Sequence, residues 1–237
     1  MTQLFLDIGN SRVKYLKQHD DGDTGGWCLL SELSDSGDLF SGVTRVWCSC
    51  VGGDERRRWV YSLLAARVAV VTLVESRQLV HLFKPAYSRP ETMGVDRWLA
   101  LLAVLERHSE APIIVVDAGT ALTIDVLLGN QHLGGYILPG YRTQLAAMVG
   151  QAALPGVADG LMPALTLGAS TEQAMAHGVW LGLAAAVMAV CRQHEGAKLY
   201  LTGGDGASLM AVVDYQAELR DNLVLEGLMT LPTESIN

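Results

Sequence analysis

The chain has 237 residues, half of them apolar, and a formal net charge of −8. The length suits two compact domains, and the apolar half of the sequence is enough to bury a sizeable core. The acidic balance argues against a nucleic-acid partner, because the largest basic cluster is Arg56-Arg57-Arg58. We expect these three arginines to form the solvated face of a helix.

The first motif near the N-terminus is Asp7-Ile8-Gly9-Asn10-Ser11-Arg12-Val13-Lys14. Apolar residues on both sides of it predict two strands joined by a tight turn. Gly9 would let the backbone approach a ligand closely, and Asp7 would offer a hard oxygen to a phosphate-bound Mg²⁺. A hairpin with Asn or Gly at its tip is also common for purely structural reasons, so one such turn does not distinguish a phosphate site from an ordinary hairpin.

The rest of the first half predicts strands at 27–30, 43–51 and 68–74, and a helix from Asp54, its expected cap, to Arg67. We expect residues 34–42 to be rich in loop. This order of strands and helix matches one RNase H-like half.

A further helix is predicted from about Val95 to His108, because apolar residues recur on one helical face. Asp96 and Arg97 lie in its first turn. One interpretation makes Asp96 a favourable charge at a helix N-terminus and Arg97 its surface partner. The other gives both residues a role in a site.

The second half opens with the same design, a buried β-branched run from Ile113 followed by a turn and a second strand. The turn residues align in pairs: Asp117 with Asp7, Gly119 with Gly9, and Thr120 with Asn10. Thr120 and the turn amides can donate to phosphate oxygens. Two copies, each opening a half of the chain, predict a duplicated α/β domain with two phosphate-facing hairpins across a cleft.

A third element is the strand at 198–202, which runs into Gly203-Gly204 and a helical stretch. A glycine pair in this place lets a nucleotide lie against bare backbone. A helix is expected to begin at Ser170 or Thr171. Its uncharged run, 178–191, falls short of the roughly 18 residues of a membrane span, so we expect a core helix or a subunit contact.

The four cysteines, Cys28, Cys48, Cys50 and Cys191, have no paired spacing. A metal site at Cys48-Ser-Cys50 would need two further ligands that the sequence does not offer, so buried free thiols are favoured. The cytoplasm is then the expected compartment.

Together, Asp-x-Gly-Asn-Ser-x-x-Lys at 7–14, Asp-x-Gly-Thr-Ala-x-Thr-x-Asp at 117–125 and Thr-Gly-Gly-Asp at 202–205 resemble the superfamily of acetate kinase, sugar kinases, Hsp70 and actin. The segment Tyr87-x-x-Pro90-x-x-x-Gly94-x-Asp96-Arg97 narrows the resemblance to type III pantothenate kinase, the family that includes the Bvg accessory factor. The resemblance covers nearly the whole chain. It implies two actin-like ATPase halves, 1–109 and 110–237, and ATP-dependent phosphorylation of pantothenate in coenzyme A biosynthesis.

The resemblance also implies roles for individual residues. Asp96 is the expected catalytic base, Asp7 is expected to hold Mg²⁺ directly or through water, and Asp117 to lie near a monovalent cation, K⁺ or ammonium. ATP and its phosphates would contact Asp7, Ile8, Gly9, Asn10, Ser11, Arg12, Val13, Lys14, Thr120, Gly203 and Gly204. Pantothenate would contact Tyr87, Gly94, Val95, Asp96, Arg97 and Thr171. Arg97 suits the carboxylate of pantothenate because its guanidinium can pair in bidentate fashion.

The resemblance also implies a homodimer. The charge and the short apolar run at 178–191 lead us to expect no nucleic-acid or membrane partner. Two other functions stay open. One is another small-molecule kinase or phosphatase of the superfamily, because only Tyr87 and Gly94-x-Asp96-Arg97 specify pantothenate. The other is a non-enzymatic regulator on the same fold, against which the intact Asp7, Asp96 and Asp117 argue.

Overall fold

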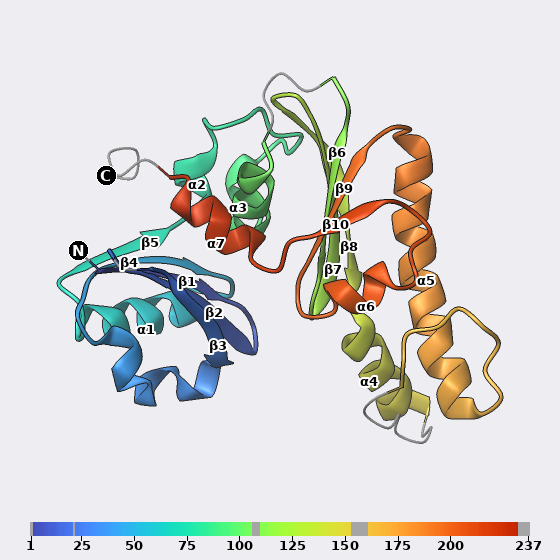
Figure 1. Ribbon diagram of the computed structural model, residues 1–237, viewed down its shortest axis with the longest axis horizontal. Coiled ribbons are helices and arrows are strands. Elements are labelled where there is room, and N and C mark those ends of the chain that lie inside the picture. The colour runs from blue at the N-terminus through green and yellow to red at the C-terminus, as the bar shows by residue number, and fades with distance from the viewer. Residues whose placement is uncertain (1, 21, 106–109, 153–160, 232–237) are drawn as a thin grey trace. The chain divides into compact units, whose positions relative to one another are not determined.

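A computed structural model describes residues 2–20, 22–105, 110–152 and 161–231 (Figure 1). Its contacts divide the chain into two compact units, Met1–Val104 with Asn222–Asn237, and Leu105–Asp221. The boundary predicted between residues 109 and 110 borders a segment, 106–109, outside the described residues. The division of function between 1–109 and 110–237, and the cleft predicted between them, stay predictions.

The first unit contains one five-stranded sheet with helices on both faces. Its strands stand in the order β3-β2-β1-β4-β5, with β1, β2 and β3 antiparallel and β4 and β5 parallel to β1. Its elements are β1 (Thr2–Ile8), β2 (Arg12–Gln18), β3 (Thr24–Leu29), β4 (Val43–Cys50), α1 (Asp54–Ala65), β5 (Val70–Val74), α2 (Ser76–Leu79), α3 (Val95–Ala103) and α7 (Leu223–Met229), with 3-10 turns at Leu30–Asp35, Gly37–Phe40 and Pro90–Thr92.

The second unit repeats this sheet, in the order β8-β7-β6-β9-β10. Again three antiparallel strands are followed on the other side by two parallel ones. Its elements are β6 (Ile113–Ala118), β7 (Ala121–Leu128), β8 (Gln131–Pro139), α4 (Tyr141–Ala152), α5 (Thr171–Gln193), β9 (Lys198–Thr202), α6 (Gly206–Met210) and β10 (Ala217–Leu219). The fold is thus a duplicated α/β architecture, as the paired turns predicted.

The register of the strands places the two aspartates at equivalent positions. In the first sheet Asp7 lies opposite Lys14 of β2 and beside Ser49 of β4. In the second, Asp117 lies opposite Thr123 of β7 and beside Thr202 of β9.

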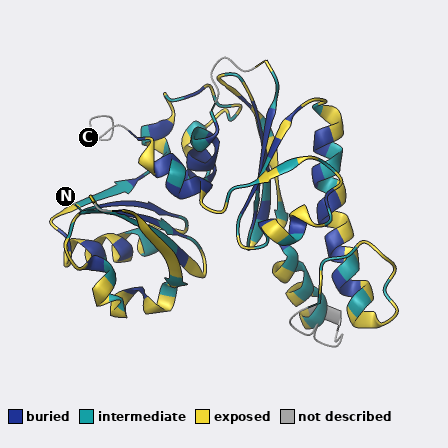
Figure 2. Ribbon diagram, viewed as in Figure 1, coloured by how far each residue is buried: buried dark blue, intermediate teal, exposed yellow. Residues whose placement is uncertain are grey.

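Each aspartate points away from the main hydrophobic cluster of its sheet. Successive residues of a strand face opposite sides, and Leu4, Leu6 and Ile8 of β1 belong to the buried cluster that includes Val60 and Leu64 of α1. Figure 2 shows buried positions on the strands of this sheet and on α1. Asp7 therefore faces the other side of the sheet, where α7 contacts β1 and α3 contacts β4. A Cβ at Gly227 of α7 would lie 2.1 Å from the carbonyl oxygen of Leu99, so α7 packs directly on α3.

Helix α5 supplies much of the core of the second unit, with Val179, Leu183 and Val187 among its buried residues. Among the described residues it is the one helix with the length and apolar composition of a membrane span, and half of its most apolar window is buried. A core helix of a soluble protein has the same properties, so α5 does not by itself indicate a membrane protein.

Local predictions needed three corrections. Gly53, not Asp54, is the N-cap of α1, because Asp54 already has helical conformation and its carboxylate pairs with Arg57. Helix α1 ends at Ala65, short of the predicted Arg67. Helix α3 ends at Ala103, short of the predicted end at His108, and residues 106–108 of that prediction lie outside the described residues.

Candidate functional site

The first turn is closed by the backbone. The amide of Gly9 donates to the carbonyl oxygen of Arg12 at 3.0 Å, which folds residues 9–12 tightly between β1 and β2. Asn10 and Ser11 are exposed at the tip. The predicted phosphate residues 7–14 therefore form one continuous hairpin.

Asp7 is the charged centre of this hairpin. Its carboxylate accepts a hydrogen bond from Ser49 Oγ at 2.8 Å. The pKa of Asp7 is raised to about 6, chiefly by burial and also by the nearby negative charge of Asp96, while the Ser49 hydrogen bond and the charge of Lys14 act to lower it. The raised pKa means that the ionised carboxylate lacks enough compensating positive charge among its neighbours.

This donor set fits a divalent cation. Mg²⁺ prefers carboxylate oxygens and is usually bound by one or two carboxylates together with substrate phosphates. The carboxylates of Asp7 and Asp96 interact repulsively here, and a bound cation would relieve that repulsion. Asp7, with Asp96 nearby, could therefore hold a divalent cation in this unit.

The start of α3 positions Asp96. Gly94 is the N-cap of the helix, and the Asp96 carboxylate turns back to accept from the backbone amide of Arg97 at 2.9 Å. A Cβ at Gly94 would lie 2.4 Å from Asp96 Oδ1, so any larger residue would displace the carboxylate. Asp96 does interact with the helix N-terminus, but its charge also reaches Asp7.

Arg97 is buried, with 6 % of its surface exposed. Its Nη1 donates to the hydroxyl oxygen of Tyr87 at 2.8 Å, and its guanidinium carbon lies 5.6 Å from the centre of the Tyr87 ring. The interpretation of Arg97 as a surface partner is therefore wrong. A buried arginine held by a tyrosine is the kind of group that binds a carboxylate.

The second turn is shaped by backbone contacts. The amide of Gly119 donates to the carbonyl oxygen of Ala121 at 2.9 Å. The carbonyl oxygen of Thr120 accepts from the amide of Gly140 at 2.9 Å and from Thr143 Oγ1 at 2.6 Å. A Cβ at Gly140 would lie only 1.9 Å from the carbonyl oxygen of Gly119. The Pro-Gly that ends β8 thus packs against this turn.

Gly203 lies against the same turn from the other side. Its φ of +90° belongs to the region that favours glycine. A Cβ there would lie 2.3 Å from the carbonyl oxygen of Ala118 and 2.4 Å from Asp117 Oδ1. The amide of Asp205 donates to that same Ala118 oxygen at 2.9 Å. The glycine pair and the second turn are therefore built as one surface.

The predicted site residues divide between the two units. The first unit holds the hairpin 7–14, Tyr87 and Gly94 to Arg97, and the second holds Asp117, Thr120, Gly203 and Gly204. Thr171 also lies in the second unit, exposed at the first position of α5 after the Ser170 cap.

Sequence reasoning missed three residues of these surfaces. Ser49 holds Asp7, Gly140 supports the second turn, and Arg56 reaches the first turn instead of lying on a solvated face. Ser49 was detectable in principle, because the duplication aligns it with Thr202, which precedes the glycine pair.

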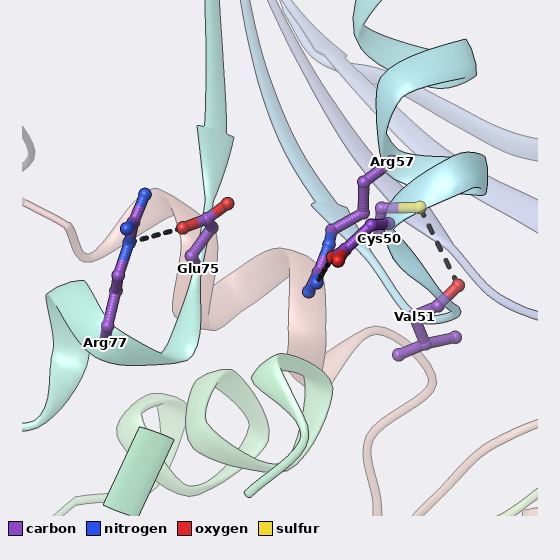
Figure 3. A network of polar contacts seen from close by, with 6 residues as sticks. Cys50, Val51, Arg57, Glu75 and Arg77 are labelled. Carbon is purple, nitrogen blue, oxygen red and sulfur yellow. Dashed lines mark hydrogen bonds and ion pairs between the residues drawn. The ribbon is translucent and has the colours of Figure 1, made fainter. Parts of the chain in front are cut away.

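The arginines around α1 differ in their surroundings. Arg57 of α1 pairs with Asp54, and Arg77 of α2 pairs with Glu75 (Figure 3).

The cysteines, all of them among the described residues, take part in no covalent link. The Sγ atom of Cys50 lies 3.7 Å from the carbonyl oxygen of Val51 (Figure 3). All four cysteines are free thiols in the structure. Burial raises the pKa of Cys48 well above its ordinary value, so this thiol stays protonated near neutral pH.

Comparison with known proteins gives a consistent result. A family model described as type III pantothenate kinase matches residues 3–193. The type III pantothenate kinase of Acinetobacter baylyi is 33% identical over 239 residues, covering 96% of each chain.

Solved structures agree on the fold. A Baf family protein from Campylobacter jejuni has a TM-score of 0.66 at 22% identity, covering 95% of both chains. The activator of 2-hydroxyisocaproyl-CoA dehydratase from Clostridium difficile, solved with ADPNP bound, has a TM-score of 0.52 at 11% identity, covering 97% of this chain and 92% of the other. With motifs, fold and near-full-length similarity in agreement, this chain belongs to the type III pantothenate kinase family.

Proposed function

We propose that this chain transfers the γ-phosphoryl group of ATP to the primary hydroxyl of pantothenate, the first step of coenzyme A biosynthesis. Membership of the family supports the reaction. The observation that supports a role for particular residues is the geometry at the start of α3. There Asp96 directly precedes Arg97, which is buried and bonded to Tyr87, and the negative charge of Asp96 acts on Asp7. An acid-binding group and a proton acceptor thus stand side by side.

Asp96 is the general base in this proposal. The hydroxyl oxygen of pantothenate bonds to the γ-phosphorus as the bond to the β–γ bridging oxygen breaks, and ADP leaves. The hydroxyl proton passes to the Asp96 carboxylate, which also orients the nucleophile. A weak base suffices, because phosphoryl transfer depends chiefly on positioning and charge stabilisation.

Arg97 and Tyr87 are the residues proposed to select pantothenate. The Arg97 guanidinium binds the carboxylate of pantothenate, and the Tyr87 hydroxyl holds the guanidinium in place. Gly94, Val95 and Thr171 are the further residues proposed to bind pantothenate. Fixing the carboxylate end of pantothenate places its hydroxyl end for attack.

Nucleotide binding is assigned to both turns. The hairpin from Asp7 to Lys14 contacts the phosphates through its turn amides and the side chains of Asn10, Ser11 and Lys14. Thr120 contacts phosphate from the second turn, and Gly203-Gly204 offers bare backbone to the nucleoside. The close packing of Gly203 against Ala118 supports a single continuous binding surface there.

Two cations complete the proposed site. Asp7 would hold Mg²⁺ directly or through water, and Asp117 would lie at a K⁺ or ammonium ion. When bound, such cations neutralise charge on the phosphates. The repulsion between Asp7 and Asp96 supports the first assignment, and the second rests on the family resemblance.

A homodimer in the cytoplasm is the proposed state of the protein. The middle of α5 supports the dimer, because its exposed residues between 174 and 185 are uncharged (Ala174, Gly178, Leu181, Gly182 and Ala185), while the charged Glu172 and Arg192 are exposed nearer its ends. Leu181 alone is 53% exposed. Light scattering after size exclusion should give twice the chain mass of 25.4 kDa, and Leu181→Glu should shift it to the monomer mass.

The test of the activity is a coupled ADP-release assay on purified protein. Pantothenate should be the preferred acceptor in a panel of small alcohols and hydroxy acids, with turnover that requires Mg²⁺ and rises with K⁺ or ammonium. Preference for another alcohol would contradict the proposed substrate, and full activity in K⁺- and ammonium-free buffer would remove the monovalent cation.

A further inference from the structure

Arg56, in the first turns of α1, points at the first phosphate turn. Its Nη1 lies 3.1 Å from Asn10 Oδ1, 3.3 Å from the carbonyl oxygen of Val51 and 3.5 Å from that of Gly9. One nitrogen thus spans the end of β4 and the tip of the β1–β2 hairpin. The side chain is half-buried, unlike that of Arg58.

A bare glycine makes room for this arrangement. Gly52 has a φ of +122°, which favours glycine. A Cβ there would lie 2.9 Å from Arg56 Cδ and 3.1 Å from Arg56 Nε. The arginine stem therefore lies flat across Gly52, and the backbone of the β4–α1 connection directs it toward Asn10.

The contact fixes the orientation of the Asn10 amide. A guanidinium has donors and no acceptor, so the atom of Asn10 that faces Arg56 must be the oxygen. The amide nitrogen of Asn10 then points away from Arg56 with both of its hydrogens. Among the described residues this nitrogen has no protein partner, so its two donors are available to a phosphate oxygen.

The neighbouring arginines do not share this geometry. Arg57 is paired with Asp54, and Arg58 is exposed. Three consecutive arginines therefore include one that reaches the turn and two that serve as matched controls.

We propose that Arg56 is a positioning residue for ATP, which holds the Asn10 amide so that its N–H donors face the nucleotide phosphates. The proposal rests on the proposed function of the first turn as a phosphate site. Arg56 acts through Asn10, so removing either residue should remove the same contribution to nucleotide binding.

The test is a double-mutant cycle on the full chain. Asn10→Ala and Arg56→Ala should each raise the KM for ATP about tenfold, the loss expected for a charge-assisted hydrogen bond, with kcat and the KM for pantothenate little changed. The double variant should be no worse than either single one. Arg56→Lys should recover only part of the loss, because an ammonium lacks the planar fork, and Arg58→Ala should match the parent protein.

The outcomes separate the two proposals. If Asn10→Ala raises the KM but Arg56→Ala does not, the positioning role is overturned and the phosphate turn stands. If the two losses multiply in the double variant, Arg56 acts independently of Asn10 and the proposal also fails. If neither substitution changes the KM while the parent protein is active, both the positioning role and the assignment of this turn are overturned. Thermal unfolding of each variant controls for loss of fold.

Discussion

The two phosphate turns share a strand order and a register but differ in what surrounds them. The first turn is surrounded by polar and charged side chains. Asp7 lies beside Ser49 and Lys14 and near Asp96, and Arg56 contacts Asn10 at the tip of the turn. The second turn is surrounded mainly by backbone. Gly140 and Gly203 both lie so close to this turn that a Cβ at either position would collide with a carbonyl oxygen of the turn. Duplication thus preserved the framework while the two copies took different surroundings.

The difference in surroundings suggests that the two turns have different roles. A buried carboxylate with a raised pKa is typical of a site that handles charge during a reaction. A turn built from close glycine contacts has little charge to offer but a rigid shape for a ligand to lie against. We therefore propose that the first turn holds the metal and the reacting phosphates, and that the second turn supplies most of the surface that binds the rest of the nucleotide.

The substitution expected to have the largest effect is Asp7→Asn, which tests whether the charge at the first turn is needed for turnover. The amide keeps the shape but loses the charge that holds a cation, so kcat should fall by about 10³-fold or more. The circular dichroism spectrum and the unfolding transition should remain those of a folded protein. Near-normal kcat in the presence of Mg²⁺ would remove the metal role of Asp7.

Asp96→Asn should have the next largest effect. Loss of a positioned base typically costs about 10²-fold or more in kcat, and pantothenate binding should change little because Arg97 is intact. Initial-rate kinetics at varied pantothenate give both parameters. A rise in KM with unchanged kcat would make Asp96 a binding residue, and the base would have to lie elsewhere.

Arg97→Ala separates binding from chemistry within α3. Removing a buried charge that pairs with the substrate carboxylate should raise the KM for pantothenate by about 10- to 100-fold, with a smaller effect on kcat. Tyr87→Phe, which removes only the hydroxyl that accepts from Arg97, should give a weaker version of the same change. Equal losses of kcat in both variants would speak against the assignment.

Gly203→Ala tests the second turn. The new Cβ would meet Ala118 and Asp117, so we expect a loss of at least about 1 kcal/mol of unfolding free energy beyond that of a matched control. Gly196→Ala is that control, since Gly196 has a φ of +76° and open space around its Cα. Denaturant titration of both variants measures the difference, and equal losses would show that the contact is not restrictive.

A further expected effect, on stability rather than on activity, is a pH dependence of the free energy of unfolding. Because the pKa of Asp7 is raised to about 6 in the folded chain, the native state binds this proton more tightly than the unfolded state. The cost of ionising Asp7 therefore develops as the pH rises from about 4 to 6. Without divalent cations, Asp7→Asn should gain stability relative to the parent protein across this range, and a constant difference would contradict the raised pKa.

Much of the fold was predictable because it follows from local patterns. Alternating apolar residues placed both hairpins, and α5, expected to begin at Ser170 or Thr171, begins at Thr171 with Ser170 as its cap. The first residue of α1 was misplaced by one position, since Gly and Asp both suit a helix start.

The candidate site was predictable only where a motif carries it. The Asp-x-Gly turns and the α3 start were found, but Ser49, Arg56 and Gly140 were not. Ser49 reaches Asp7 through pairing between strands 42 residues apart, and Arg56 reaches Asn10 across 46 residues. Such contacts depend on tertiary packing, which local pattern does not encode. Arg56 was instead assigned to a solvated face because its charged neighbours resemble one.

The most direct test of the division between the two turns is calorimetric binding of ADP without divalent cations to three variants. We predict that Asp7→Asn binds ADP within about threefold of the parent protein although its turnover is lost. Gly203→Ala should bind ADP about tenfold or more weakly, a loss near 1.4 kcal/mol, and Gly196→Ala should bind normally. Normal binding by Gly203→Ala, together with lost binding by Asp7→Asn, would contradict the account.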